Sequence, residues 1–514
     1  MEADCLRHTD FPHTSRLFAE YLYDFERVSG FYDYSPRDGG AFRAAADQVH
    51  FPDGRREALV AALRKQNAGN PALDLLARPG TMAVVTGQQV GLFSGPAYTV
   101  YKALTAVRLA RDFTERGIPS VPVFWLATED HDFAEVRGCW VFDSSHRAVR
   151  LEMSGSGPER SPAGRIEIAT SPVEELRAAL GSFAFGEEVV AAVERTFVPG
   201  RTLGEAFGDL LKELLSGYGM LFVDPMEPGI RELAAPFLRQ AADAGPELTE
   251  LVIERSRALE AAGYHAQVHV EQESTLLFAL ENGRRLPLRR NGGGANSMQA
   301  ERLSPNALLR PVMQDFILPT VAYVGGPAEL AYLAQSQVLY RALLGRMPVV
   351  VHRAGFTLLD ARSDKLLRRY GLSVPDVFHG EDALRERLAK RLVPEPLERS
   401  LSGAAKETEE RIVRLRRDVL EFDPTLAAAL DTSGRKILYQ LSKLERKVAR
   451  EAVRRSSRAS EETSYLAGLI YPAKHPQERF YSILPFLARH GFDLIGRIYE
   501  NVRLDCPDHR ILVV

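Results

Sequence analysis

The chain has 514 residues, enough for about three domain-sized units or for one large core with insertions. Its content of 45% hydrophobic and 26% charged residues is that of an ordinary soluble globular protein. The formal net charge of -3 gives no reason to expect nucleic acid or an anionic membrane as a partner. The first residues, MEADCLRH, lack the order of a signal peptide, and no run approaches the roughly 18 apolar residues of a membrane span.

The first informative stretch is residues 84–102, VVTGQQVGLFSGPAYTVYK. A short β-prone run, residues 82–85, leads into three closely spaced glycines: Gly87, Gly91 and Gly95. A helix is expected to start at Pro96, because the fixed φ and the missing N–H of proline suit the first turn of a helix. Apolar residues at i, i+4 and i+7 support that helix: Val100, Leu104 and Val107. The pattern predicts a strand, a glycine-rich turn and a helix.

The second informative stretch is residues 121–132, VPVFWLATEDHD. Its apolar part, residues 121–126, predicts a buried parallel strand. An acidic cluster comes just past the end of that strand: Glu129, Asp130, His131 and Asp132. Ligands of open α/β sheets bind outside the carboxyl ends of the strands, so we expect this cluster to lie at a site.

The two stretches complement each other in charge. Free N–H groups in a glycine-rich turn, with Lys102 one turn into the helix, favour a phosphate or a carboxylate. Asp130 and Asp132 around His131 can receive an ammonium, hold a metal or move a proton. We therefore expect a ligand that carries both signs of charge. The alternative is that the glycines are scaffolding and the acidic residues are solvated helix caps.

A second turn of this kind follows later in the chain. Residues 322–324 predict a strand, residues 325–326 are a glycine turn, and Pro327 opens an apolar helix that runs to about residue 344. Glu329 and Tyr332 lie three apart, on one face close to the helix start. Capping of this helix is the alternative role for Glu329.

Two further segments supply polar side chains. Residues 347–351 predict another strand, which leads to Arg353, and an arginine there can bind a carboxylate or a phosphate. The tail carries Lys474, Gln477 and Arg479, which can contact a nucleotide. The alternative is that these three residues cap the helix that follows them.

The periodicity changes beyond residue 380. Residues 409–420 and 437–448 each place apolar side chains at spacings of three and four, and Asp423-Pro424 between them suits a bend. This pattern predicts an antiparallel coiled-coil arm. Because the run is short for an isolated coil, we expect it to pack against the body or against a second subunit, and we predict a homodimer through the arm. We interpret its basic residues as a solvated face.

Long blocks of the sequence resemble one family. These blocks are TGQQVGLFSGPAYTVYKA, VPVFWLATEDHDF and LLRPVMQDFILPTVAYVGGPAELAYLAQ, together with FYDYSP, MPVVVHRAGFTLLD and YPAKHPQERFYSILPF. They are similar to the cysteine ligases of bacillithiol biosynthesis. The resemblance covers most of the chain and implies addition of cysteine to glucosamine-malate, with an amide formed between the amino sugar and the cysteine carboxyl group.

The resemblance also implies a fold. The family's core is similar to the nucleotide-binding domain of class I aminoacyl-tRNA synthetases and nucleotidylyl transferases, with inserted segments and a coiled-coil arm. The HxGH signature of that superfamily is absent here, because residues 87–98 take its place without a histidine. We therefore expect an α/β protein with a Rossmann-type parallel-sheet core. The expected parts are a helical segment (1–78), the core (79–378) with insertions near 139–215 and 260–310, the arm (379–462) and a returning C-terminal segment (463–514).

The hypothesis for the reaction is that ATP activates cysteine, as an adenylate or an acyl phosphate, and that the sugar amine then attacks. The catalytic candidates, which bind the amine and remove its proton, are Asp130, His131 and Asp132. The substrate-binding candidates are Thr86, Gly87, Gln88, Gln89, Ser94, Gly95, Tyr98, Lys102, Gly325, Gly326, Glu329, Tyr332 and Arg353. ATP or ADP is the expected nucleotide, with no set of metal ligands. The three cysteines (Cys5, Cys139 and Cys506) have no metal-type spacing and indicate a reducing, cytoplasmic location.

Two alternatives from other classes stay open. A metal-dependent hydrolase would use the acidic cluster after the second strand as ligands for zinc or a similar ion. A non-catalytic scaffold would keep the fold and expose its arm to a partner. P-loop, GxGxxG, HExxH and GxSxG signatures are absent from the sequence.

Overall fold

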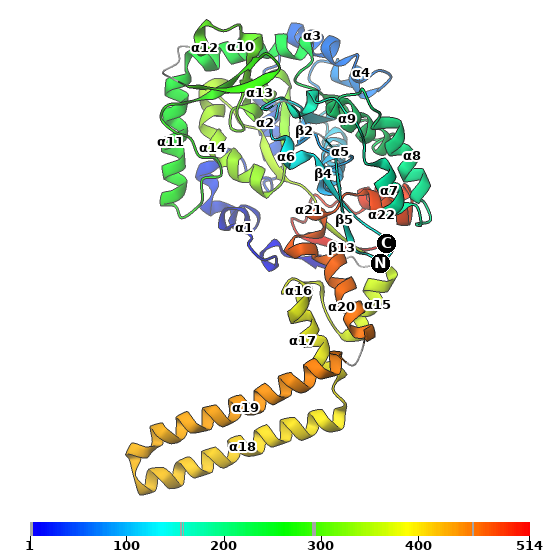
Figure 1. Cartoon of the computed structure of the whole chain (residues 1–514). Helices are drawn as coiled ribbons and strands as arrows, with labels where there is room; N and C mark the ends of the chain where they lie inside the picture. Colours follow the sequence, from blue (N-terminus) through cyan, green and yellow to red (C-terminus); the bar gives the residue numbers. More distant parts are fainter. Residues whose placement is uncertain (1–3, 155–156, 158, 290–293, 455–456) are drawn as a thin grey trace. The chain divides into compact units, whose positions relative to one another are not determined.

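The computed structural model describes residues 4–154, 157, 159–289, 294–454 and 457–514 (Figure 1). The chain divides into two compact units. The first consists of Met1–Thr357 and Glu478–Leu512 with Val514, and the second consists of Leu358–Gln477 with Val513. Within the described ranges, no helix combines the length and the apolarity that crossing a membrane requires.

A five-stranded parallel sheet forms the centre of the first unit, with strand order β11-β10-β2-β3-β6. Its strands are β2 (Met82–Gln89), β3 (Ser120–Ala127), β6 (Leu221–Val223), β10 (Thr320–Gly325) and β11 (Val349–His352). Counted along the chain, the sheet has the order 3-2-1-4-5 that is typical of Rossmann folds. The predicted Rossmann-type core is therefore confirmed. The order reverses between β2 and β10, where ligands of such sheets bind.

The two faces of the sheet are covered by different segments. Alternate residues of β3 (Val121, Val123 and Trp125) join one apolar core with the N-terminal helices and with helices α10 (Pro228–Asp243) and α14 (Pro327–Leu344). Helix α5 (Tyr98–Glu115) connects β2 to β3. It begins two residues after Pro96, where we expected the helix to start. β3 is buried along nearly its whole length, as its apolar run predicts.

β2 continues past the predicted strand 82–85 and runs through Gly87 to Gln89. Gly87 pairs with Trp125 of β3. A Cβ atom on Gly87 would lie 2.7 Å from the Trp125 carbonyl oxygen, closer than real contacts allow. Gly87 is therefore required for strand packing, and the expectation that it belongs to a phosphate-binding turn is wrong.

The remaining segments of the first unit surround the sheet (Figure 1). The N-terminal helices are α1 (Arg16–Tyr23), α2 (Ala41–Asp47), α3 (Asp53–Leu63) and α4 (Ala72–Leu76). The chain between β3 and β6 includes β4 (Gly138–Phe142), β5 (Ala148–Glu152), α7 (Val173–Leu180), α8 (Gly186–Thr196) and α9 (Leu203–Leu214). Between β6 and β10, α10 is followed by helix α11 (Gly245–Ala261), and α13 (Arg310–Ile317) comes just before β10. Between these two helices lies an antiparallel sheet of β7 (Ser274–Glu281), β8 (Arg284–Arg289) and β9 (Leu303–Pro305). The C-terminal return contains α22 (Leu484–His490), α23 (Asp493–Glu500) and β13 (His509–Val513).

The second unit contains a long helical hairpin. Helices α18 (Glu395–Phe422) and α19 (Ala427–Arg454) run antiparallel around a turn that begins at Asp423, as predicted for the coiled-coil arm. Arg416 and Asp431 pair across the hairpin at 2.8 Å. Gly434 lets the helices approach closely, because a Cβ there would lie 2.9 Å from Ile412. The shorter helices of this unit are α15 (Ala361–Tyr370), α16 (Val374–Val377), α17 (Glu381–Leu392) and α20 (Ser457–Ile470).

Candidate active site

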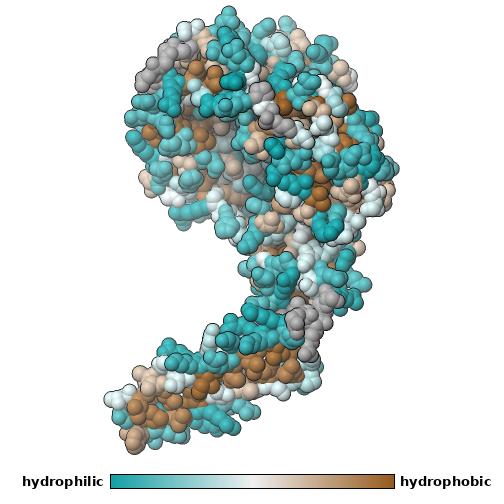
Figure 2. Space-filling model, in the orientation of Figure 1, coloured by the Kyte–Doolittle hydropathy of each residue, from teal (hydrophilic) through white to brown (hydrophobic). Residues whose placement is uncertain are grey.

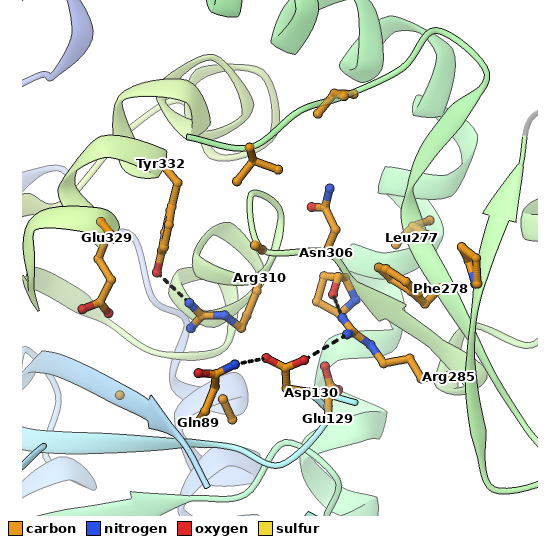
Figure 3. Close-up of a pocket in the computed structure, with 18 of the residues that line it drawn as sticks. Gln89, Glu129, Asp130, Leu277, Phe278, Arg285, Asn306, Arg310, Glu329 and Tyr332 are labelled. Carbon is orange, nitrogen blue, oxygen red and sulfur yellow. Dashed lines mark hydrogen bonds and ion pairs between the residues drawn. The ribbon is translucent and has the colours of Figure 1, made fainter. Parts of the chain in front are cut away.

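A cavity of about 730 Å³ lies at the carboxyl ends of β2, β3, β10 and β11 (Figure 3). Its opposite wall comes from the β7–β8 hairpin, the loop before it and the residues between β9 and α13. The cavity brings together ten of the residues expected at a site: Gly87, Gln88, Gln89, Tyr98, Asp130, Gly326, Glu329, Tyr332, Arg353 and Arg479. The ends of the strands thus meet at one cavity, as parallel pairing requires.

Lys102, in α5, is buried beneath this cavity with 2% of its side chain exposed. Its Nζ donates to the carbonyl oxygen of Gly87 at 2.6 Å and to Oε1 of Gln88 at 3.2 Å, and it pairs with Glu329 at 2.6 Å. An ammonium group has three N–H donors, so all of them are used. In the structure Glu329 thus occupies the position beside Lys102 where an anion of the substrate was expected.

Glu329 both caps α14 and lines the cavity. Its carboxylate accepts hydrogen bonds from the backbone N–H of Gly326 and from the hydroxyl of Tyr323, each at 2.8 Å. Burial opposes the charge, yet Lys102 and these donors hold the pKa of the Glu329 carboxyl below its ordinary value. Glu329 therefore remains ionised, with its oxygens engaged by the protein.

Arg353 follows β11 and was expected to bind a carboxylate or a phosphate. It instead forms a two-point ion pair with Glu478, with N–O distances of 2.9 and 2.5 Å and side-chain exposures of 3% and 5%. Glu478 also accepts from the backbone N–H of Phe356 at 3.0 Å. The arginine is thus neutralised within the protein, which corrects its predicted role as a free anion receptor.

Asp130 follows β3, and its carboxylate points into the cavity (Figure 3). It accepts hydrogen bonds from Nε2 of Gln89 at 2.6 Å and from the backbone N–H of His131 at 2.7 Å, and Arg285 lies 4.0 Å away. Burial opposes the charge, but Gln89, Arg285 and the His131 N–H together hold the pKa of Asp130 below its ordinary value. About a third of the side chain, 34%, stays exposed. The structure therefore presents an ionised carboxylate to a ligand.

The ring of His131 already accepts a hydrogen bond from Arg285. Its Nδ1 lies 3.1 Å from Nη1 of Arg285, and a guanidinium can only donate, so Nδ1 accepts and the ring proton sits on Nε2. Burial, followed by the charge of Arg285, lowers the pKa of His131, which makes the ring neutral at pH 7. The one lone pair of the neutral ring is thus engaged. His131 supports Arg285 in the structure, and its part in removing the proton of the amine stays a prediction.

Arg285 and Arg310 are cavity residues that the sequence did not single out. Arg285, on β8, is held by Ser304 at 3.0 Å and by the carbonyl oxygen of Pro305 at 2.6 Å. Arg310 begins α13 and donates to the hydroxyl of Tyr332 at 2.7 Å (Figure 3). Arg310 lies within the block LLRPVMQDF, so its sequence context was visible although its role was not.

Two family models match this chain. Residues 1–299 and 295–354 match the N-terminal Rossmann-like domain of bacillithiol biosynthesis BshC, and residues 356–514 match the C-terminal coiled-coil domain. The chain belongs to the BshC family. A relative from Solibacter usitatus is 55% identical over 100% of both chains and has the name "Putative cysteine ligase BshC". Relatives with the same name from Koribacter versatilis (34% identical, 100% of both chains) and Symbiobacterium thermophilum (34%, 96% of both) match nearly as completely.

Some residues expected at the site of this BshC family member lie elsewhere. The Thr86 hydroxyl is buried and donates to the Val324 carbonyl oxygen, and Ser94 is buried against Ser482 at 2.8 Å. Asp132 is exposed and caps a short helix, α6 (Phe133–Val136), by accepting from the backbone N–H of Glu135. In the structure these three side chains make contacts within the scaffold, and none of them lines the cavity.

Two N–H groups of the predicted anion cradle at the start of α5 are paired within the protein. The N–H of Gly95 donates to the Leu92 carbonyl, and that of Ala97 donates to the Tyr481 carbonyl. Donors already paired within the backbone cannot serve a ligand. Gly325 closes β10, where the backbone N–H of Arg353 donates to its carbonyl oxygen. The N–H groups of Gly95 and Ala97 are therefore not available to the negative group of a ligand.

The predicted nucleotide residues fall in both units. Gln477, in the second unit, uses its amide on the backbone of Leu358 and Leu469, and Lys474 is exposed. Arg479, in the first unit, is exposed and lines the cavity. Among the residues that the structure describes, no group of three or more His, Cys, Asp or Glu side chains is arranged to hold a metal ion. The metal ligands of the hydrolase alternative are therefore not assembled.

Proposed function

We propose that this protein is a cysteine ligase that joins the carboxyl group of L-cysteine to the amine of glucosamine-malate, the last step of bacillithiol biosynthesis. The observation that carries the proposal is the full-length match to relatives that have the name of this activity. The cavity at the switch point of the sheet adds chemical support, since it holds an ionised Asp130 and a half-buried Arg310 within one space. A ligand with an ammonium and a carboxylate suits such a space.

The proposed reaction includes activation by ATP. A carboxylate is a poor electrophile and an ammonium is not a nucleophile, so amide formation in water needs an activated acyl group. Transfer of AMP to the cysteine carboxylate releases pyrophosphate, and attack by the amine then releases AMP. Transfer of the terminal phosphoryl group instead yields ADP, and attack then releases orthophosphate. Arg479, which lines the cavity, stays a proposed contact of ATP or ADP. Lys474, in the second unit, stays a separate candidate, whereas the amide of Gln477 is engaged by the backbone.

In this proposal Asp130 binds the ammonium of the amino sugar and accepts the proton that the amine loses. Gln89 and Arg285 hold the carboxylate in place by the contacts described above. Lys102 and Arg353 act by pairing with Glu329 and Glu478 rather than by touching the substrate. The polar wall of the cavity is thus fixed before any ligand binds, which is the preorganisation that catalysis needs.

The proposal predicts that the purified protein, supplied with cysteine, glucosamine-malate and ATP, forms bacillithiol. Product mass identifies the thiol, and release of pyrophosphate or of orthophosphate distinguishes the two forms of activation. Omitting each substrate in turn is the control. Absence of bacillithiol from a folded protein with all three substrates present would refute the function.

We also propose that the protein is cytoplasmic and forms a homodimer through the arm. Large apolar side chains are exposed on both helices of the hairpin and in the turn between them, and Figure 2 shows brown patches along the hairpin. These side chains are Leu397, Val413, Leu415, Leu420, Phe422, Leu426, Ile437, Tyr439 and Leu444. Apolar surface of this extent is typical of a protein interface. Sedimentation equilibrium is expected to give the mass of two chains, and Leu415→Glu with Ile437→Glu should shift it toward one. A wild-type protein that stays monomeric at micromolar concentration would contradict the dimer.

A further inference from the structure

The cationic side chains around the cavity differ in whether a carboxylate of the protein lies close to them. Lys102 pairs with Glu329, Arg353 pairs with Glu478, and Arg285 lies 4.0 Å from Asp130. Arg289, Arg479 and Arg310 also line the cavity, and none of the three has a carboxylate within 4.0 Å among the residues that the structure describes. Arg289 and Arg479 are exposed, whereas Arg310 is half-buried. The neighbours of Arg310 are phenols, with the Tyr332 hydroxyl accepting a hydrogen bond at 2.7 Å.

The nearest acidic group cannot supply the missing charge. Glu329 is already engaged by Lys102 at 2.6 Å and by the Gly326 N–H and the Tyr323 hydroxyl at 2.8 Å each. Arg310 is half-buried and pairs with no carboxylate, so part of its hydration is lost without a direct ion pair. A ligand that brings its own negative group to Arg310 compensates for that loss.

We propose that Arg310 is the receptor for a carboxylate of the malate half of the amino-sugar substrate, and this inference rests on the proposed ligase function. Figure 3 shows its guanidinium in the cavity, with Tyr332 on one side and the Gln89–Asp130 pair on the other. Arginine presents a planar set of N–H donors that matches a carboxylate. Asp130 then receives the ammonium and Arg310 receives the carboxylate of the same molecule.

Malate is the source of the anion because its carboxylates persist through the reaction. The cysteine carboxylate is the group that is activated and becomes the amide, so an arginine that held it would oppose the chemistry in the ground state. A malate carboxylate carries the same charge before and after the amide forms. Binding it positions the amine and leaves the reacting bond free.

The test compares Arg310→Lys and Arg310→Met with the wild-type enzyme. Loss of a charge-assisted, two-point contact is expected to raise KM for glucosamine-malate about 10- to 100-fold in Arg310→Met, and less in Arg310→Lys, which keeps the charge. KM for cysteine and KM for ATP should change less than about 3-fold, since neither molecule contacts this group in the proposal. L-Malate alone should inhibit the wild type competitively against glucosamine-malate, and its Ki should rise in both variants.

Arg284→Met is the matched control, because Arg284 is an exposed arginine next to Arg285 on β8 and does not line the cavity. A selective rise in KM for ATP would assign Arg310 to a phosphate, and a selective rise for cysteine would assign it to the amino acid. Either outcome, or unchanged constants for all three substrates, overturns the malate assignment. If Arg310→Met does not fold, Arg310→Lys and Tyr332→Phe give the same comparison. A wild-type enzyme that forms no bacillithiol would instead refute the ligase function itself.

Discussion

Asp130→Asn is expected to lower kcat/KM for bacillithiol formation by about 10²- to 10⁴-fold without unfolding the protein. The asparagine oxygen can still accept from the backbone N–H of His131, and Gln89 can turn its amide so that its oxygen accepts from the asparagine NH2, so the loop after β3 keeps its hydrogen bonds. What is lost is the negative charge that receives the ammonium and its proton. Initial rates across glucosamine-malate concentrations, with thermal unfolding as the check on folding, measure both parts of the prediction.

Asp132→Asn is the matched control for this experiment. It is the same chemical change two positions along the chain, but Asp132 is exposed and caps α6, a position where asparagine is equally good. We expect its rate to stay within about 3-fold of wild type. A metal hydrolase that used both carboxylates as ligands would lose activity in both variants. Full activity of Asp130→Asn would remove Asp130 from the mechanism.

The sequence located the cavity because the main signals were local. The apolar run that becomes β3 predicts a buried strand by itself, and the polar residues after it must then lie at the edge of the sheet. The same argument applies to β10 and to the start of α14. Helical periodicity in residues 409–420 and 437–448, with a bend between, likewise predicted the hairpin without knowledge of tertiary contacts.

The partners of the charged residues could not be found in this way. Arg353 and Glu478 are 125 positions apart, and nothing near either one indicates that they meet. A lysine near a glycine-rich turn has the same local pattern whether it holds a ligand or, as Lys102 does, a buried glutamate. Gly87 shows the same limit, because the residue that leaves no room for a Cβ atom there, Trp125, lies on the neighbouring strand.

The separate roles of the three residues after β3 could not be predicted from the sequence either. Asp130, His131 and Asp132 are consecutive, so the sequence gives no reason to separate them. The structure separates them by direction, since Asp130 lines the cavity, His131 contacts Arg285 and Asp132 caps a helix. Arg285 comes from a hairpin inserted far along the chain, and its contact decides which nitrogen of His131 carries the proton.

Arg353→Met alone is expected to lower the free energy of unfolding by about 3–5 kcal/mol. The change leaves the carboxylate of Glu478 buried without its cation, although it still accepts a hydrogen bond from the backbone N–H of Phe356. Glu478→Gln alone should also destabilise, since it strands the buried guanidinium. Urea unfolding of each variant at pH 7, with the midpoint and slope compared, measures the loss.

The pH dependence of this loss has a defined sign. Burial raises the pKa of Glu478, but the charge of Arg353 outweighs it and lowers that pKa to about 2, below the ordinary value of 4.5. The ion pair therefore contributes fully above pH 4.5, and its contribution falls as the pH decreases toward 2. The difference in stability between wild type and Glu478→Gln should be constant between about pH 6 and pH 8 and shrink in acid. A difference that grew on acidification would contradict the pairing.

The double variant Arg353→Met with Glu478→Gln separates the two roles that Arg353 can have. Removing both charges leaves no buried ion, and the glutamine oxygen can still accept from the Phe356 N–H, so we expect recovery of most of the lost stability. If Arg353 acts only through Glu478, KM for each substrate should return toward wild type together with stability. If stability returns while KM for one substrate stays raised, Arg353 contacts that substrate after all. The paired measurement thus decides whether Arg353 only supports the wall of the cavity or also contacts a substrate.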